Sequence, residues 1–251
     1  MNQTSKETSA GSNIPRDLFV TTRWTVIVAA GGKASLEAEA ALQELCRTYW
    51  YPLYAYVRRQ GWSREDSEDL TQAFFSKILG NTNLSVLDSE KGRFRRFLLA
   101  SLKHFLANEW DKLRAQKRGG GQVPLSLDWQ SADTLYSSTS ADNLSPDKLY
   151  DRAWAVTLLE RVIGLLHLEC VAEGKGEMFE RLKDFLTLEK SAISYEQAAT
   201  TLNISEGAAR VTVHRLRKRY RELLRDEIAQ TLLHGAQVED EMRALFLAFS
   251  T

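Results

Sequence analysis

The stretch that decides the fold runs from Ser194 to Tyr220 and reads SYEQAATTLNISEGAARVTVHRLRKRY. Its first four residues have the spacing of a capping box, in which the Ser194 hydroxyl accepts the amide of Gln197 and begins a helix. The next segment, 203–205, predicts a tight turn, with Ile204 as its buried plug and Ser205 as the N-cap of a second helix. This stretch therefore predicts a helix-turn-helix.

The second helix of this motif has one apolar face and one basic face. Its apolar residues follow helical spacing and predict the buried side: Ala209, Val213, Leu216, Tyr220 and Leu223. A different face carries basic side chains at the same spacing: Arg210, His214, Arg217 and Arg221. An ordinary surface helix with solvated charges is the alternative. Such helices usually alternate acidic and basic residues, and this one does not.

Small residues in the first turn, Gly207 and Ala208, allow this helix to approach the edges of DNA bases closely, while its C-terminal half meets phosphates. Glu206 is suited to accept from a cytosine amino group and Arg210 to bind O6 and N7 of guanine. The sequence thus predicts a basic helix in the major groove. Its predicted DNA-binding residues are Ser205, Glu206, Gly207, Arg210, His214, Arg217 and Arg221.

Another helix that bears on function is predicted over residues 66–79, DSEDLTQAFFSKIL. It begins with acidic residues and ends with Lys77, an order that suits the helix dipole. Leu70, Phe74 and Ile78 form its predicted buried stripe, and Asp66, Asp69, Gln72 and Ser76 fall on more exposed faces. Taken alone, such an acidic start is typical of ordinary helix capping.

The helix predicted after Gly92 is both basic and aromatic. Its buried side is predicted to carry Phe94, Leu98, Leu102, Phe105, Trp110 and Leu113. Its polar residues lie on or beside the opposite side: Arg93, Arg96, Lys103, His104, Asn108 and Arg114. Basic and aromatic residues together suit single-stranded nucleic acid, because bases stack and phosphates need neutralising. We expect most of these aromatic side chains to be structural.

The whole chain has no net charge, with 33 basic and 33 acidic residues, yet the charges are segregated. Residues 91–118 and 205–225 are strongly basic, whereas acidic residues gather at 65–69 and 239–241. The apolar fraction of 43% and charged fraction of 26% are typical of a soluble globular protein. The polar start predicts no secretory signal, and the chain offers no apolar run of bilayer length, so we expect a cytoplasmic protein without membrane insertion.

Helical periodicity dominates the chain and predicts an all-α fold of two helical domains joined by a flexible linker. We expect a disordered N-terminal extension over 1–15, a first domain over 16–118 and a linker over 119–146. The linker opens with three glycines and closes at Ser145-Pro146. The helix-turn-helix domain is expected over 147–228, followed by a C-terminal tail, 229–251, part of which reads as a short acidic amphipathic helix.

The two motifs together, in this order and without a third domain between them, resemble the extracytoplasmic-function (ECF) sigma factors of bacterial RNA polymerase. Residues 66–72, DSEDLTQ, are similar to the D-A-E-D-L-x-Q segment of region 2.2. Residues 92–118, beginning GRFRRFLLA, are similar to regions 2.3 and 2.4. Residues 204–210, ISEGAAR, with the basic run after them, are similar to the region 4 helix-turn-helix, although Ala208-Ala209 replaces the usual Thr-Val pair.

The resemblance implies a protein that directs core polymerase to promoters. Region 2.2 implies docking on the β′ clamp helices through Asp66, Glu68, Asp69 and Gln72. The next segment implies melting of the minus-ten element, with His104 at the position where the family usually has Asn, and region 4 implies binding of the duplex minus-thirty-five element near the β flap. An anti-sigma factor, a regulatory kinase and autoinhibition by the tail all remain open as means of regulation.

The sequence bears on two other classes of function. A helix-turn-helix transcription regulator that is no sigma subunit explains residues 194–225 but leaves the acidic and basic-aromatic helices as coincidence. An enzyme is not expected, because the four histidines lack H-E-x-x-H spacing and the chain has neither a phosphate loop nor a G-x-S-x-G elbow. Cys46 and Cys170 are expected to be buried small hydrophobes, and neither a metal nor another cofactor is expected.

Overall fold

The computed structural model describes Arg23, Val26, residues 36–80, 93–115, Thr134, Tyr136, Ser137, 144–187, 194–232 and 237–250. Within these ranges the regular elements are helices, apart from an isolated antiparallel bridge between Arg93 and Leu232, so the all-α prediction is confirmed there. The helices are α2 Leu36–Arg59, α3 Arg64–Gly80, α4 Phe94–Ala115, α6 Pro146–Ala172, α7 Gly176–Leu182, α8 Asp184–Thr187, α9 Tyr195–Leu202, α10 Glu206–Ala229 and α11 Val238–Leu247. The predicted N-terminal extension, 1–15, and nearly all of the predicted linker lie outside the described residues.

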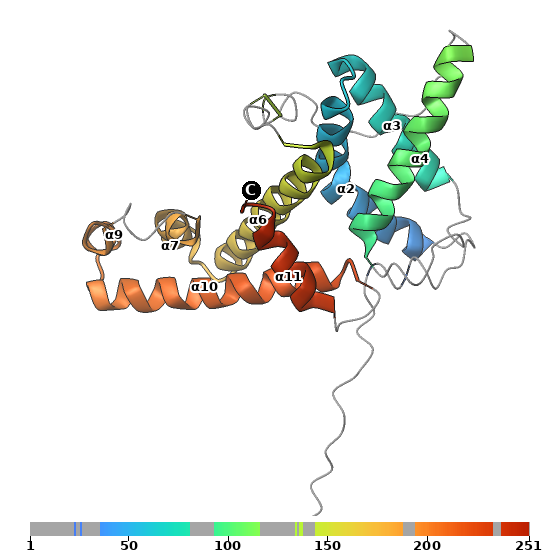
Figure 1. Cartoon of the computed structure of the whole chain (residues 1–251). Helices are drawn as coiled ribbons and strands as arrows, with labels where there is room; N and C mark the ends of the chain where they lie inside the picture. The colour runs from blue at the N-terminus through green and yellow to red at the C-terminus, as the bar shows by residue number, and fades with distance from the viewer. Residues whose placement is uncertain are drawn as a thin grey trace, which may run out of the picture.

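Helices α2, α3 and α4 pack together in one part of the molecule, and α6 runs from them to α10 (Figure 1). α2 is held by a run of buried residues on both sides of Pro52, among them Tyr49, Leu53 and Tyr56. The predicted apolar side of α4 is confirmed for Phe94, Leu98, Leu102 and Phe105, which are all buried. The side chains of Trp110 and Leu113 lie outside the described residues.

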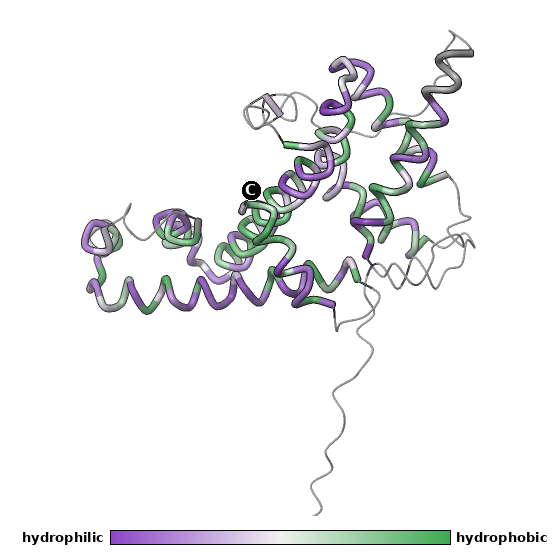
Figure 2. The backbone as a smooth tube through the Cα atoms, in the orientation of Figure 1, coloured by the Kyte–Doolittle hydropathy of each residue, from purple (hydrophilic) through white to green (hydrophobic). Residues whose placement is uncertain are grey.

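The 27-residue helix α6 is shared by both parts of the molecule. Ser145 is its N-cap, and the Ser145 hydroxyl accepts the amide of Lys148. Pro146 lies in the first turn, where the lack of an amide hydrogen costs nothing. Figure 2 shows α6 as mainly hydrophobic, whereas α10 is mainly hydrophilic. A helix that is apolar over most of its surface must be covered by several neighbours, and α6 contacts α2, α7, α10 and α11.

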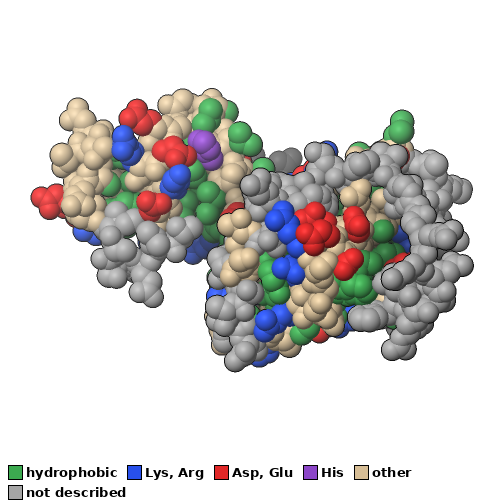
Figure 3. Space-filling view, turned by 90° about the horizontal axis from the view of Figure 1, so that it is seen from above, with side chains coloured by type: hydrophobic (Ala, Val, Ile, Leu, Met, Phe, Trp, Pro, Cys, Tyr) green, Lys and Arg blue, Asp and Glu red, His purple; other side chains and the backbone are tan. Residues whose placement is uncertain are grey.

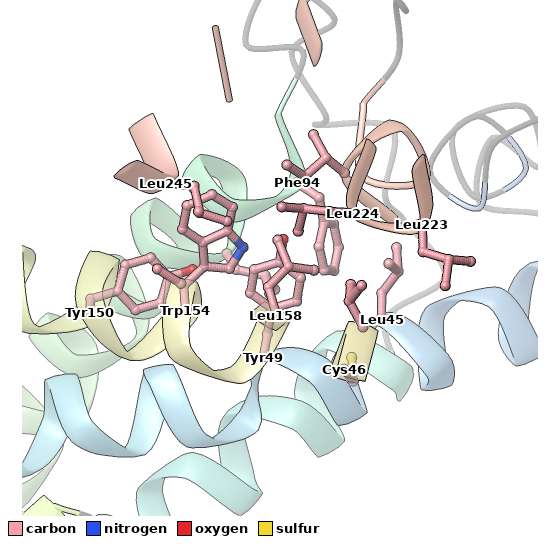
Figure 4. Packing of buried hydrophobic residues seen from close by; sticks show 14 of the residues in the cluster. Leu45, Cys46, Tyr49, Phe94, Tyr150, Trp154, Leu158, Leu223, Leu224 and Leu245 are labelled. Atoms are coloured by element: carbon pink, nitrogen blue, oxygen red, sulfur yellow. The ribbon is translucent and has the colours of Figure 1, made fainter. Parts of the chain in front are cut away.

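The hydrophobic core is continuous from the α2–α4 part of the chain to α10 and α11. Figure 4 shows its centre, where side chains of α2, α4, α6, α10 and α11 converge. Its labelled members are Leu45, Cys46, Tyr49, Phe94, Tyr150, Trp154, Leu158, Leu223, Leu224 and Leu245. Each half of the chain therefore buries part of its apolar surface against the other, which stabilises the arrangement by about 25 cal/mol for each Å² removed from water.

The C-terminal segment forms a packed helix. α11 buries Glu241, Met242 and Leu245 against α6 and α10, and lies across them in Figure 1. Among the described helices, none is both long and apolar enough to cross a membrane.

Candidate nucleic-acid interface

The predicted helix-turn-helix is formed by α9 and α10. The Ser194 hydroxyl accepts the amide of Gln197 at 3.4 Å and begins α9, as the capping box predicts. α9 ends at Asn203, which adopts a left-handed conformation with φ 53°, one that asparagine tolerates better than most residues. The Ser205 hydroxyl then accepts the amide of Ala208 at 3.2 Å and begins α10. The turn between α9 and α10 is thus defined by the left-handed Asn203 and by the Ser205 cap.

The prediction that Ile204 plugs this turn is wrong, because its side chain is 38% exposed. Ala198 and Ala199 of α9 and Ala209 of α10 are buried instead. Residues as small as alanine allow two helices to pack closely.

The apolar stripe predicted for α10 is confirmed. Ala209, Val213, Leu216 and Leu223 are buried, and Leu224 and Ile228 extend the stripe toward α11. Tyr220 is half-buried and donates its hydroxyl to the Leu159 carbonyl of α6 at 3.4 Å. This packing fixes the rotation of α10 about its axis and therefore decides which side chains face outward.

On the outer side of the first turn of α10, Arg210 and Glu206 pair with each other. The Arg210 Nη2 atom lies 2.5 Å from Glu206 Oε1, and the guanidinium lies over the Tyr195 ring, 4.6 Å from its centroid. Both charged side chains are about half exposed, and exposed pairs of this kind contribute only about 0.2–1 kcal/mol. This pair can therefore be exchanged for contacts with a ligand at low cost.

Gly207 lies in the same turn and faces open space. A Cβ atom built on it would meet only the Ser205 hydroxyl, at 4.0 Å. The packing of the protein itself therefore gives no reason for a glycine here, since any small side chain fits. The absence of a side chain keeps the backbone of this turn accessible to an external group.

The remaining predicted residues of α10 differ in their surroundings. His214 and Arg221 are exposed, and Arg221 donates through Nε to the Arg217 carbonyl at 3.2 Å. Arg217 itself turns toward α8, where its Nε and Nη2 atoms donate to the Phe185 carbonyl at 3.1 and 2.7 Å. The guanidinium of Arg217 thus ties α8 to α10.

Two exposed basic residues of α10, Arg215 and Lys218, were not among the predicted site residues. The sequence signal for them is the basic run itself, 215–221, but both residues fall outside the helical spacing of Arg210, His214, Arg217 and Arg221. With Arg221 and Arg225 they make the outward face of α10 predominantly basic, and this face also exposes Glu222, which lies 4.0 Å from Lys218, and Asp226. Arg219 differs, because it pairs with Glu169 of α6 at 2.6 Å, and this contact raises the pKa of the guanidinium.

The predicted DNA-binding residues of α4 whose side chains the structure describes are exposed. Arg96, Lys103, His104 and Asn108 are exposed, and Lys103 pairs with Asp147 in the first turn of α6. The side chain of Arg114 lies outside the described residues.

Arg93 precedes α4, where its guanidinium lies 3.2 Å from Glu241 Oε1 and 3.7 Å from Asp240 Oδ2. Arg93 and Arg210 lie at different ends of the interface. Arg93 bridges to Leu232, beyond the C-terminal end of α10, and Arg210 is near its start. The 24 residues of α10 span about 36 Å.

Arg95, which the sequence placed in the basic segment, is buried. It pairs with Asp151 of α6 and donates to Glu241 of α11 at 3.0 Å. Sequence reasoning missed this role, because the partners lie 56 and 146 residues further along the chain.

The predicted polymerase-binding residues lie at the start of α3. The Ser63 hydroxyl accepts the Asp66 amide at 3.0 Å and donates to the Asp66 carboxylate at 2.8 Å. Glu68 pairs with Arg64 at 2.9 Å. Asp69 is exposed and Gln72 is half-buried. Part of the acidic character of this helix start therefore serves capping, as the simpler interpretation expects, and Asp69 presents its charge to solvent.

Figure 3 shows both acidic and basic side chains on one face of the molecule. Within the described residues, no group of three or more His, Cys, Asp or Glu side chains is arranged to hold a metal ion.

Comparisons with protein-family models, with curated proteins and with solved structures give no match. The resemblance to ECF sigma factors therefore stays a prediction from the motifs.

Proposed function

We propose that this chain is an ECF-type sigma factor, which brings core RNA polymerase to promoter DNA. The observation that carries the proposal is the α9–α10 pair, in which a capped helix presents an open first turn and a basic outer face. A helix of this kind reads the major groove through its first turns and meets phosphates through its later ones.

In this proposal α10 binds the minus-thirty-five element as duplex. Arg210 exchanges Glu206 for guanine O6 and N7, a bidentate contact that discriminates between bases by about 1–3 kcal/mol. The exposed cations further along α10 neutralise phosphates, so affinity falls steeply as salt rises.

The exposed residues of α4 would then hold a melted strand of the minus-ten element. Arg96, Lys103, His104 and Asn108 supply cations and hydrogen-bonding groups for it. Captured and unstacked bases offset part of the cost of unpairing, which is a few kcal/mol for each flipped base. The acidic start of α3 would bind the β′ clamp helices and α9–α10 would lie near the β flap.

The test is capture of core polymerase by the full chain, followed by transcription in vitro from a pool of fragments of the source genome. We expect capture and promoter-specific transcripts. Asp69→Arg should abolish capture, because it reverses an exposed charge of the proposed docking surface. Glu177→Arg is the matched control, since Glu177 is likewise exposed near the start of a helix, α7, and should leave capture unchanged.

Two results would contradict the proposal. The chain would not be a sigma factor if it failed to capture core polymerase. The same would follow if Asp69→Arg and Glu177→Arg weakened capture equally. Specific binding of duplex DNA without any capture of polymerase would instead identify the chain as a helix-turn-helix transcription regulator.

A further inference from the structure

Helix α11 carries three consecutive acidic residues, and each contacts an arginine of the proposed DNA-binding segments. Glu239 Oε1 lies 2.9 Å from Arg225 Nη1 of α10. Asp240 and Glu241 both contact Arg93, at the start of α4. One short acidic helix therefore pairs with cations from both halves of the proposed DNA interface.

The position of α11 is fixed by buried contacts. Glu241 is 2% exposed, and its second carboxylate oxygen accepts from the buried Arg95 at 3.0 Å. Leu245 is fully buried in the common core. Two residues after α10, the Thr231 carbonyl accepts the amide of Phe94 at 3.1 Å, so the chain after α10 is joined to α4 by backbone as well.

Carboxylates and phosphates bind arginine through the same N–H donors of the guanidinium group. An arginine that pairs with α11 is therefore less able to neutralise a phosphate. We propose that α11 is an intramolecular acidic ligand that competes with DNA phosphates for Arg93 and Arg225, and so restrains DNA binding by the chain. This inference rests on the proposed function and names a means of regulating the same interface.

The three acidic residues differ in how easily DNA can replace them. Glu239 and Asp240 are 59% and 50% exposed, so solvent and salt weaken their pairs with Arg225 and Arg93. Glu241 is buried and keeps its contact with Arg95. Competition is therefore expected at the two exposed carboxylates first, while Glu241 holds the helix in place.

The test compares the full chain with the double variant Glu239→Gln, Asp240→Asn, in which only exposed carboxylates change. Binding of a labelled DNA duplex is measured by fluorescence anisotropy between 50 and 200 mM salt. The variant should bind more tightly. Arg93 keeps its contact with Glu241 in this variant, so the additional phosphate contact is expected at Arg225. One such contact steepens the dependence of log K on log salt by about 0.9, so the advantage of the variant should be about 3.5-fold larger at 50 mM than at 200 mM.

The control is the double variant Glu173→Gln, Glu180→Gln, which removes the same number of negative charges. These two carboxylates pair with Lys175 and Lys183, which lie outside α4 and α10. The control should match the unchanged chain. If the Glu239→Gln, Asp240→Asn variant and the control variant both bind DNA with equal affinity and equal salt slope, this inference alone is overturned. Absence of DNA binding by every chain, with or without core polymerase, would overturn the proposed function as well.

Discussion

The guanidinium carbon of Arg95 lies 4.3 Å from the centroid of the Trp154 ring, so a cation of α4 stacks on a buried aromatic side chain of α6. The Tyr150 hydroxyl adds a hydrogen bond to the Arg95 carbonyl at 3.0 Å. Burial disfavours the charged form, but the carboxylates of Glu241 and Asp151 outweigh it and raise the pKa of Arg95. This arginine joins three helices and is not available to a ligand.

Replacement of Arg95 by Met should destabilise the protein by about 3–5 kcal/mol, because Glu241 would keep a buried charge with only Arg93 to compensate it. Urea unfolding followed by circular dichroism measures the change. The double variant Arg95→Met, Glu241→Met should recover most of the loss, since it removes both buried charges. The exposed neighbour Arg96→Met should change stability by less than about 0.5 kcal/mol. A loss as large for Arg96→Met would contradict this assignment.

Gly207→Ala separates stability from recognition. The new methyl group meets open space, so the substitution should stabilise the protein by about 0.4–1 kcal/mol through the unfolded chain. If the first turn of α10 approaches bases closely, the same methyl should weaken binding of duplex DNA. Thermal unfolding and anisotropy on the same preparation measure the two effects. Unchanged DNA affinity in the stabilised variant would exclude close approach at this turn.

Arg210→Ala should cost about 1–3 kcal/mol on the preferred duplex and relax the preference at a single base pair. Its effect on folding should stay below about 1 kcal/mol, because the pair with Glu206 is exposed. A panel of duplexes with one changed base pair each measures the preference. An equal loss on every duplex would make Arg210 a phosphate contact.

Acid should unfold the protein partly through Glu44 of α2. Burial raises the pKa of Glu44, but the hydrogen bond and charge of Arg161 outweigh it, so the pKa lies below its usual value of 4.5. A lowered pKa in the folded state contributes stability above pH 4.5, and that stability is lost as the pH falls through the folded pKa.

Arg161→Met should therefore lower the urea midpoint at pH 7 and flatten its fall below pH 4.5. Arg161 also pairs with Glu227 of α10 at 2.7 Å, so part of the loss at pH 7 is independent of Glu44. Arg47→Met is the control, because Arg47 lies further from Glu44, at 3.6 Å, and is mostly exposed. An identical acid profile for all three chains would refute the role of Arg161.

The helix-turn-helix could be predicted because its signals are local. The caps at Ser194 and Ser205 bond to amides three residues away, and the stripe from Ala209 to Leu223 follows from helical spacing alone. The exposure of Ile204 could not be predicted, because it depends on how α9 and α10 pack and local spacing does not determine that packing.

Contacts between distant segments could not be predicted from the sequence either, because they also depend on how the helices pack. A count of charges places Arg93 and Arg95 in a basic patch and 239–241 in an acidic one. Their pairing depends on the path of α10 and on the hydrogen bond between Phe94 and Thr231. Periodicity predicted α11 as an amphipathic helix but carried no information about the surface that it covers.

The sharing of α6 sets a length scale for the whole molecule. Its 27 residues span about 40 Å. α6 packs on α2, and near its C-terminal end Glu169 pairs with Arg219 of α10. Under the proposed function, this helix acts as a ruler between the two promoter elements. The duplex repeats every 10–10.5 base pairs, so five additional pairs between the elements would turn one of them to the opposite side of the DNA. A ruler that neither bends nor twists would then confine promoter use to one spacer length, because the next spacer with the same phase is about 34 Å longer.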